Sequence, residues 1–152
     1  MGQYKGDKKL EKQKVVADAS IVVKWFLEEP FSDKARQLRD FFVTGKLILS
    51  VPTLLFYETL NALWHTGLFR EAELTLAARA LSKYGFDVWE PKGKVYEQTA
   101  MLSLKHDISV YDASYVALAL HLKTTLYTAD SELIQKLPEN TQHINNYKPQ
   151  DF

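Results

Sequence analysis

The sequence predicts one α/β domain in which helices cover a parallel sheet. Short apolar runs alternate along the chain with helix-like segments of about 10–15 residues, which is typical of parallel strands joined by crossover helices. The 152 residues suffice for one domain with a substantial core. A composition of 46% apolar and 25% charged residues is ordinary for a globular protein.

The elements follow from apolar runs and from the residues that punctuate them. Glycine and proline end the helix-like segments and separate them from the strands. The expected strands cover residues 14–18, 47–49, 86–89, 124–128 and 143–144. The expected helices cover residues 21–27, 32–43, 52–65, 71–84, 95–105, 112–122 and 131–137.

The charge distribution divides the chain into residues 1–13, a lysine-rich tail, and residues 14–152, the folded domain. Residues 1–14 hold five lysines against Asp7 and Glu11. Such a segment is typical of a solvated tail, with a phosphate-contacting arm as the alternative. Over the whole chain 19 basic residues balance 19 acidic ones, so no overall positive charge favours nucleic-acid binding.

Composition also excludes several classes of site and indicates a location. The absence of cysteine excludes disulfides, thiolate zinc sites, iron–sulfur clusters and a cysteine nucleophile. No apolar run reaches the ~20 residues of a membrane span, and the N-terminus lacks the apolar stretch of a secretory signal. We therefore expect a soluble, cytoplasmic protein.

Carboxylates are the side chains left to carry chemistry. The six glycines form no phosphate-binding loop, and the four histidines have no zinc-binding spacing. Asp18 ends the first predicted strand and Asp130 ends the fourth, and the carboxyl ends of parallel strands share the edge where ligands bind. Asp112 precedes a predicted helix. Each aspartate alone is equally compatible with a helix N-cap.

Glu58 is the fourth candidate. Its helix, residues 52–65, is apolar around most of its circumference, which predicts heavy burial. Glu58, Asn61 and His65 form one polar stripe on that helix, which is either its solvent face or part of a site. A carboxylate in an apolar helix needs a cation, and no basic residue lies within a turn, so we favour a metal ion.

Four stretches together resemble the PIN-domain ribonucleases, especially the VapC-type toxins of VapBC toxin–antitoxin pairs. The resemblance covers about residues 14–145, with the stretches in the family's order. They are Val15-Val16-Ala17-Asp18-Ala19-Ser20, Tyr57-Glu58-Thr59-Leu60-Asn61-Ala62-Leu63, Tyr111-Asp112-Ala113-Ser114-Tyr115-Val116-Ala117-Leu118-Ala119 and Leu126-Tyr127-Thr128-Ala129-Asp130-Ser131-Glu132-Leu133.

The resemblance implies a three-layer α/β/α sandwich with a parallel sheet of about five strands in the order 3-2-1-4-5. It also implies that Asp18, Glu58, Asp112 and Asp130 are the catalytic acids and bind Mg²⁺ or Mn²⁺. Oxygen ligands suit these hard cations, which promote phosphodiester hydrolysis. Ser20 and Thr128 match hydroxyl residues that orient such acids, with helix or turn capping as the alternative.

The resulting functional prediction is a metal-dependent endoribonuclease, the toxin of a toxin–antitoxin pair. Its expected partners are an RNA substrate, a small antitoxin protein that occupies the acidic cleft, and a second copy of the chain in a homodimer. The aromatic side chains of Trp25, Phe26, Trp64 and Phe69 could supply the dimer contact. Relatives often carry a basic residue where this chain has Trp64-His65, so RNA contact there would depend on His65 and Arg70.

Two alternatives share the fold. One is a housekeeping nuclease of RNA processing, which the sequence does not distinguish from a toxin. The other is a non-catalytic module that binds RNA or protein and keeps its acids only as helix caps.

Overall fold

The computed structural model describes residues 12–149 and contains a five-stranded, all-parallel sheet with strand order β3-β2-β1-β4-β5. This confirms the predicted fold class and strand order. The strands are β1 (Gln13–Ala17), β2 (Leu47–Pro52), β3 (Asp87–Trp89), β4 (Leu126–Thr128) and β5 (Thr141–His143).

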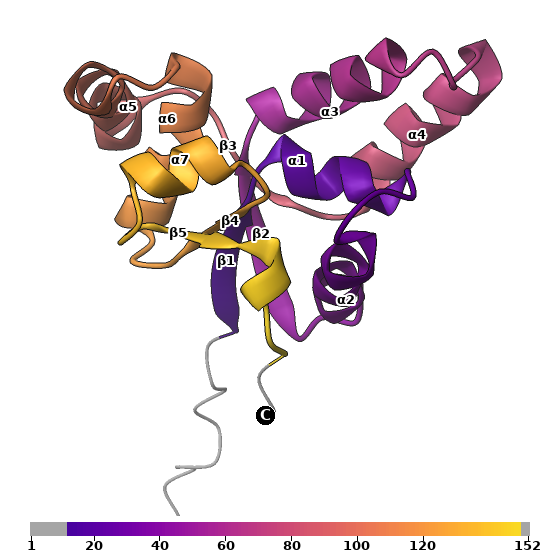
Figure 1. Cartoon of the computed structure of the whole chain (residues 1–152), viewed down its shortest axis with the longest axis horizontal. Coiled ribbons are helices and arrows are strands. Elements are labelled where there is room, and N and C mark those ends of the chain that lie inside the picture. The colour runs from indigo at the N-terminus through magenta and orange to yellow at the C-terminus, as the bar shows by residue number, and fades with distance from the viewer. Residues whose placement is uncertain (1–11, 150–152) are drawn as a thin grey trace, which may run out of the picture.

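Helices cover both faces of this sheet. They are α1 (Ala19–Val22), α2 (Ser32–Val43), α3 (Leu54–His65), α4 (Glu71–Lys83), α5 (Gly93–His106), α6 (Val110–His121) and α7 (Ser131–Lys136), with 3₁₀ turns η2 (Val23–Trp25) and η3 (Ile144–Asn146). In Figure 1, α5 and α6 lie on one side of the central strands, and α1 and α2 lie on the other. Helices α3 and α4 extend from the second side as a pair.

The central strand explains why the sheet is buried on both faces. Val15, Val16 and Ala17 of β1 are all buried, as expected for a parallel strand with helices above and below it. On one face α6 presents an unbroken run of buried residues, from Tyr115 to Ala119. Within residues 12–149, no helix is long and apolar enough to cross a bilayer.

The predicted tail, residues 1–13, lies outside the described residues except for Lys12 and Gln13. Gln13 is the first residue of β1 and pairs with Leu47 of β2. Residues 150–152 at the other end also lie outside the described residues.

Several predicted boundaries were wrong, two of them at the ends of strands. The last strand covers Thr141–His143 rather than residues 143–144, because Ile144 begins a 3₁₀ turn and points into the core. Pro52 ends β2 instead of opening a helix, and α3 begins at Leu54.

The heavy burial predicted for the helix after β2 was also wrong. Only Leu55, Thr59 and Leu63 of α3 are buried, whereas Tyr57 and Trp64 are 77% and 60% exposed. The helix therefore presents much of its apolar surface to solvent.

The four aromatic residues expected at a dimer contact are mostly inside the molecule. Trp25 is buried against Phe86, and Phe26 and Phe69 are partly buried against the hydrophobic core. Trp64 alone among the four is exposed.

Candidate acidic site at the carboxyl edge of the sheet

Asp18 lies directly after β1, and hydrogen bonds fix its position. Its side chain accepts from the backbone N–H of Ser20 at 3.1 Å and from the Ser20 hydroxyl, and so caps α1. The backbone N–H of Asp18 donates to the carbonyl of Tyr127 at 3.3 Å. Asp18 is only 7% exposed, so its carboxylate is held at the edge of the sheet with little access to water.

The ends of β1 and β4 are tied together by the two predicted hydroxyl residues. The Ser20 oxygen accepts from the backbone N–H of Ala129 at 3.0 Å and lies 3.5 Å from the Thr128 oxygen. The Thr128 hydroxyl in turn accepts from the backbone N–H of Asp130 at 3.1 Å. Ser20 and Thr128 therefore connect the segments that carry Asp18 and Asp130.

Asp130 is an exposed helix N-cap. Its side chain accepts from the backbone N–H groups of Glu132 and Leu133 at 3.0 and 3.2 Å. The capping alternative thus holds for Asp18 and Asp130, but it does not exclude a second role, because a carboxylate with one capping oxygen keeps the other free.

Asp112 is not a cap. The side chain of Ser109 caps α6 by accepting from the backbone N–H of Asp112 at 3.0 Å, which places Asp112 in the first turn of the helix. Its carboxylate is half-buried and makes no ion pair within residues 12–149. The predicted helix start at Asp112 is therefore two residues late, because the N-cap is a serine upstream.

Glu58 lies on α3 and is half-buried. Its Oε1 accepts a hydrogen bond from the hydroxyl of Tyr115 on α6 at 2.6 Å. Asn61 and His65 on the same stripe are exposed, so the solvent-face alternative holds for those two residues and not for Glu58.

The pKa values show that these carboxylates lie within electrostatic reach of one another. The pKa of Asp18 is raised to about 6, mainly by burial; the charges of Asp112 and Glu58 also raise it, and hydrogen bonds from Ser20 and Thr128 lower it. Burial likewise raises the pKa of Glu58, and the charge of Asp112 adds to it. Burial raises the pKa of Asp112 as well, with a further contribution from Asp130. Four acids from four separate segments therefore share one electrostatic environment.

Three neighbours of this cluster were not singled out from the sequence. Tyr115 was part of the apolar run on α6, and nothing in that run indicated a bond to a carboxylate on another helix. The charge of Glu132 raises the pKa of Asp112, and the charge of Lys136 opposes that rise. Lys136 lies four residues after Glu132 on α7, and its Nζ is 3.8 Å from Glu132 Oε1. This four-residue spacing in the sequence could have indicated the pair.

The donor set suits a hard divalent cation. Asp18, Glu58, Asp112 and Asp130 supply only oxygen atoms, and none of them forms an ion pair within the described part of the chain. No group of three or more His, Asp or Glu side chains in residues 12–149 is arranged to hold a metal ion as it stands. Mg²⁺ does not require such a cage, because it commonly binds through one or two carboxylates and keeps several waters.

A hollow of about 430 Å³ lies between α1 and α3, and Glu58 is the one of the four acids that lines it. Ser20 and Glu58 line it together with Lys24, Asn61 and His65. The Lys24 ammonium is buried and pairs with Glu29 at 2.9 Å, so its charge is already balanced. His65 borders this hollow, whereas Arg70 is the exposed N-cap residue of α4 and is not among its lining residues.

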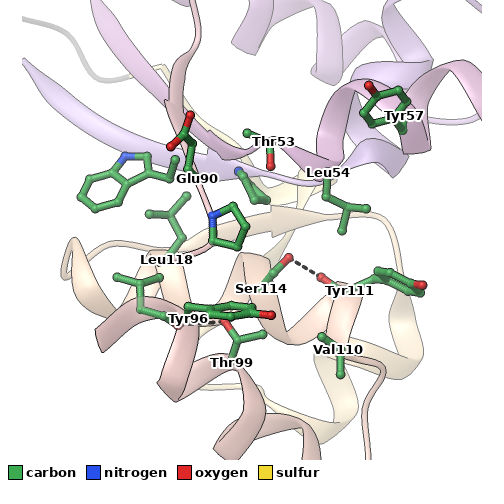
Figure 2. A pocket seen from close by; sticks show the side chains of 14 residues that line it. Thr53, Leu54, Tyr57, Glu90, Tyr96, Thr99, Val110, Tyr111, Ser114 and Leu118 are labelled. Atoms are coloured by element: carbon green, nitrogen blue, oxygen red, sulfur yellow. Dashed lines mark hydrogen bonds between the residues drawn. The ribbon is translucent and has the colours of Figure 1, made fainter. Parts of the chain in front are cut away.

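A second cavity, of about 290 Å³, is apolar and is not lined by any of the four acids. Figure 2 shows Tyr96 of α5, Tyr111 of α6 and Leu54 of α3 around it. The Ser114 hydroxyl at this cavity donates to the Tyr111 carbonyl at 2.6 Å and is satisfied within its own helix. The cavity therefore offers mainly apolar contact, with Glu90 as the one carboxylate in its lining.

Comparison with known proteins assigns the family. The PIN domain family matches residues 15–139, and the chain belongs to that family. Within it the chain is similar to VapC-type proteins. It is 33% identical over 136 residues to Ribonuclease VapC3 of Pyrobaculum aerophilum, covering 82% of this chain and 95% of that protein.

Solved structures agree on the fold. The crystal structure of PAE2754 from Pyrobaculum aerophilum has a TM-score of 0.63 and 23% identity, covering 88% of this chain and 90% of that one. The structure of VapBC-1 from nontypeable Haemophilus influenzae has a TM-score of 0.64 and 14% identity, covering 88% of this chain and 100% of that one. At these identities the structural similarity supports the architecture alone.

Proposed function

We propose that this chain is a metal-dependent endoribonuclease that hydrolyses RNA phosphodiester bonds. The observation that carries the proposal is that the buried Asp18 carboxylate, fixed by Ser20 at the carboxyl end of β1, feels the charges of both Asp112 and Glu58, and Glu58 also feels the charge of Asp112. Such repulsion costs on the order of 1–4 kcal/mol per close pair, and a bound cation relieves it. The 33% identity to a protein named as a ribonuclease supports the same class of substrate.

Each acid has a distinct part in the proposed site. Asp18 is the most rigid carboxylate, because Ser20 fixes one oxygen and burial restricts the other. The charge of Asp112 raises the pKa values of both Asp18 and Glu58. Asp130 is the exposed member and could meet the substrate or a hydrated ion. Mg²⁺ or Mn²⁺ at these residues would stabilise the negative charge on the phosphate oxygens and make a water more acidic.

RNA cleavage by wild type and Asp112→Asn, with Mg²⁺, with Mn²⁺ and with chelator, tests the proposal. We expect metal-dependent cleavage by the wild type and none by the variant, with unchanged circular dichroism. Asp40→Asn is the matched control, since Asp40 is exposed and pairs with Arg39 away from the acids. Equal cleavage by Asp112→Asn and wild type would refute the role of Asp112.

Growth, gene context, RNA cleavage and thermal melting together separate the alternatives. We propose that the chain is the toxin of a toxin–antitoxin pair, so induction without a co-expressed antitoxin should arrest growth, and a small reading frame should lie beside its gene. A housekeeping nuclease would cleave RNA without either property. A non-catalytic module would neither cleave RNA nor shift its melting temperature with Mn²⁺.

The remaining partners are proposals of the same kind. We propose a small antitoxin that occupies the acidic cleft, a homodimer, and a cytoplasmic location where RNA and antitoxin are both present. Light scattering tests the homodimer, and a monomer at micromolar concentration would contradict it. Tyr57, Trp64 and Tyr111 are each more than half exposed and are the first residues at which to seek that contact.

A further inference from the structure

Tyr115 is placed unlike any other tyrosine in the described chain. Its side chain is 1% exposed, yet its hydroxyl donates to Glu58 Oε1 at 2.6 Å. The bond joins α6 to α3, and the two bonded residues are 57 positions apart in the sequence. A buried hydroxyl that finds a charged acceptor forms one of the stronger hydrogen bonds in proteins.

The geometry connects this bond to the acidic site. Asp112 and Tyr115 lie three residues apart on α6 and therefore on neighbouring positions of one helix face. Burial is the largest cause that raises the pKa of the Tyr115 hydroxyl, and the charges of Glu58, Asp18 and Asp112 also raise it, so the hydroxyl lies within electrostatic reach of all three acids.

Glu58 needs such a partner more than the aspartates do. Asp18 is fixed by Ser20, and Asp130 is fixed by the backbone of α7, whereas Glu58 has a longer side chain with one more rotatable bond. Within residues 12–149 the Tyr115 hydroxyl is its one hydrogen-bond donor, and no basic side chain pairs with it. With Oε1 held by Tyr115, Oε2 is left for another ligand.

We propose that Tyr115 is a positioning residue that holds the Glu58 carboxylate in the orientation in which it meets the divalent cation. The inference rests on the proposed function, because it assigns Glu58 to the cation site. Partners that orient metal ligands typically affect metal affinity by about 10–100-fold when removed.

Tyr115→Phe removes the hydroxyl and keeps the ring. We expect Mn²⁺ binding, measured by calorimetry or electron paramagnetic resonance without RNA, to weaken by about 10-fold or more. Tyr147→Phe is the matched control, since Tyr147 is 4% exposed and its ring packs against Tyr127 instead of reaching the acids. Loss of Mn²⁺ affinity in Tyr115→Phe but not in Tyr147→Phe, with both variants folded, supports the proposal.

A double-mutant cycle distinguishes positioning from a general structural effect. If Tyr115 acts through Glu58, Tyr115→Phe should weaken Mn²⁺ binding in the wild type and add little in a Glu58→Gln background. An equal loss in both backgrounds, or unchanged Mn²⁺ binding in Tyr115→Phe, would overturn the proposal. If the wild type itself binds no Mn²⁺ and cleaves no RNA, the proposed function fails, and the inference about Tyr115 fails with it.

Discussion

Asp18 should destabilise the metal-free protein at neutral pH, and Asp18→Asn should therefore stabilise it. Burial raises the pKa of Asp18 from its ordinary value of 3.8 to about 6. A pKa difference of one unit corresponds to about 1.4 kcal/mol. The rise in the pKa of Asp18 therefore means that keeping this carboxylate ionised costs the folded protein about 3 kcal/mol. Asparagine removes that cost, and its side-chain oxygen can still accept from Ser20.

The sign of the effect sets its pH dependence. Because the folded protein binds the Asp18 proton more tightly than the unfolded chain, the wild type is stabilised below about pH 4 and loses that stability as the pH rises through about 6. The advantage of Asp18→Asn should thus be full at pH 7.5 and should fade as the pH falls from 6 towards 4. The buried amide offsets part of the gain, so we expect about 1–3 kcal/mol at pH 7.5.

Thermal unfolding in chelator measures this effect. For a chain of this size about 1 kcal/mol shifts the melting temperature by roughly 2–4 °C, so Asp18→Asn should melt about 2–12 °C above the wild type at pH 7.5. Asp40→Asn, at an exposed position, should melt with the wild type. An Asp18→Asn variant that is less stable than the wild type at pH 7.5, or a difference that is the same at pH 4 and pH 7.5, would contradict this account of Asp18.

Two further predictions concern the scaffold. The Thr59 hydroxyl is buried and has no hydrogen-bond partner in the described chain, so Thr59→Val should raise the free energy of unfolding in urea by about 1 kcal/mol, and a loss of stability would show that a partner exists. Gly85 has a φ of +81° and open space where a Cβ would lie, so Gly85→Ala should cost only backbone strain of about 1–2 kcal/mol, and an unchanged urea midpoint would count against this expectation.

Much of the architecture could be predicted because the signals are local. Asp130 follows β4 and caps α7, and an aspartate between an apolar run and a helical pattern is a common way for a strand to pass into a helix. The last strand was misplaced because Ile144 is fully buried without being in a strand. An apolar residue in the sequence indicates burial, but a strand also requires backbone hydrogen bonds to a neighbouring strand.

The contacts within the acidic site were harder to predict from the sequence, because they join segments that are far apart in the chain. The exposed Tyr57 and the buried Leu55 carry similar apolar signals on α3, so the face that packs inward was not evident. The apolar run on α6 did not indicate a special position for Tyr115. Its hydroxyl bonds to Glu58, which is 57 residues away in the sequence, and such a contact is not visible in a local pattern. The spacing of the acids identified candidates, and the fold determines which of them interact.

The position of β1 at the centre of the sheet has a consequence for synthesis of the protein. Val16 and Ala17 of β1 pair with Leu126 and Tyr127 of β4, so the two halves of the acidic edge come from opposite ends of the chain. Such long-range pairings form late, because the intervening loop must first be closed. A nascent chain on the ribosome has not yet joined Asp18 to Asp130 while residues 126–130 are still in the exit tunnel. The complete acidic edge therefore forms only after residues 126–130 have been translated and β4 has paired with β1.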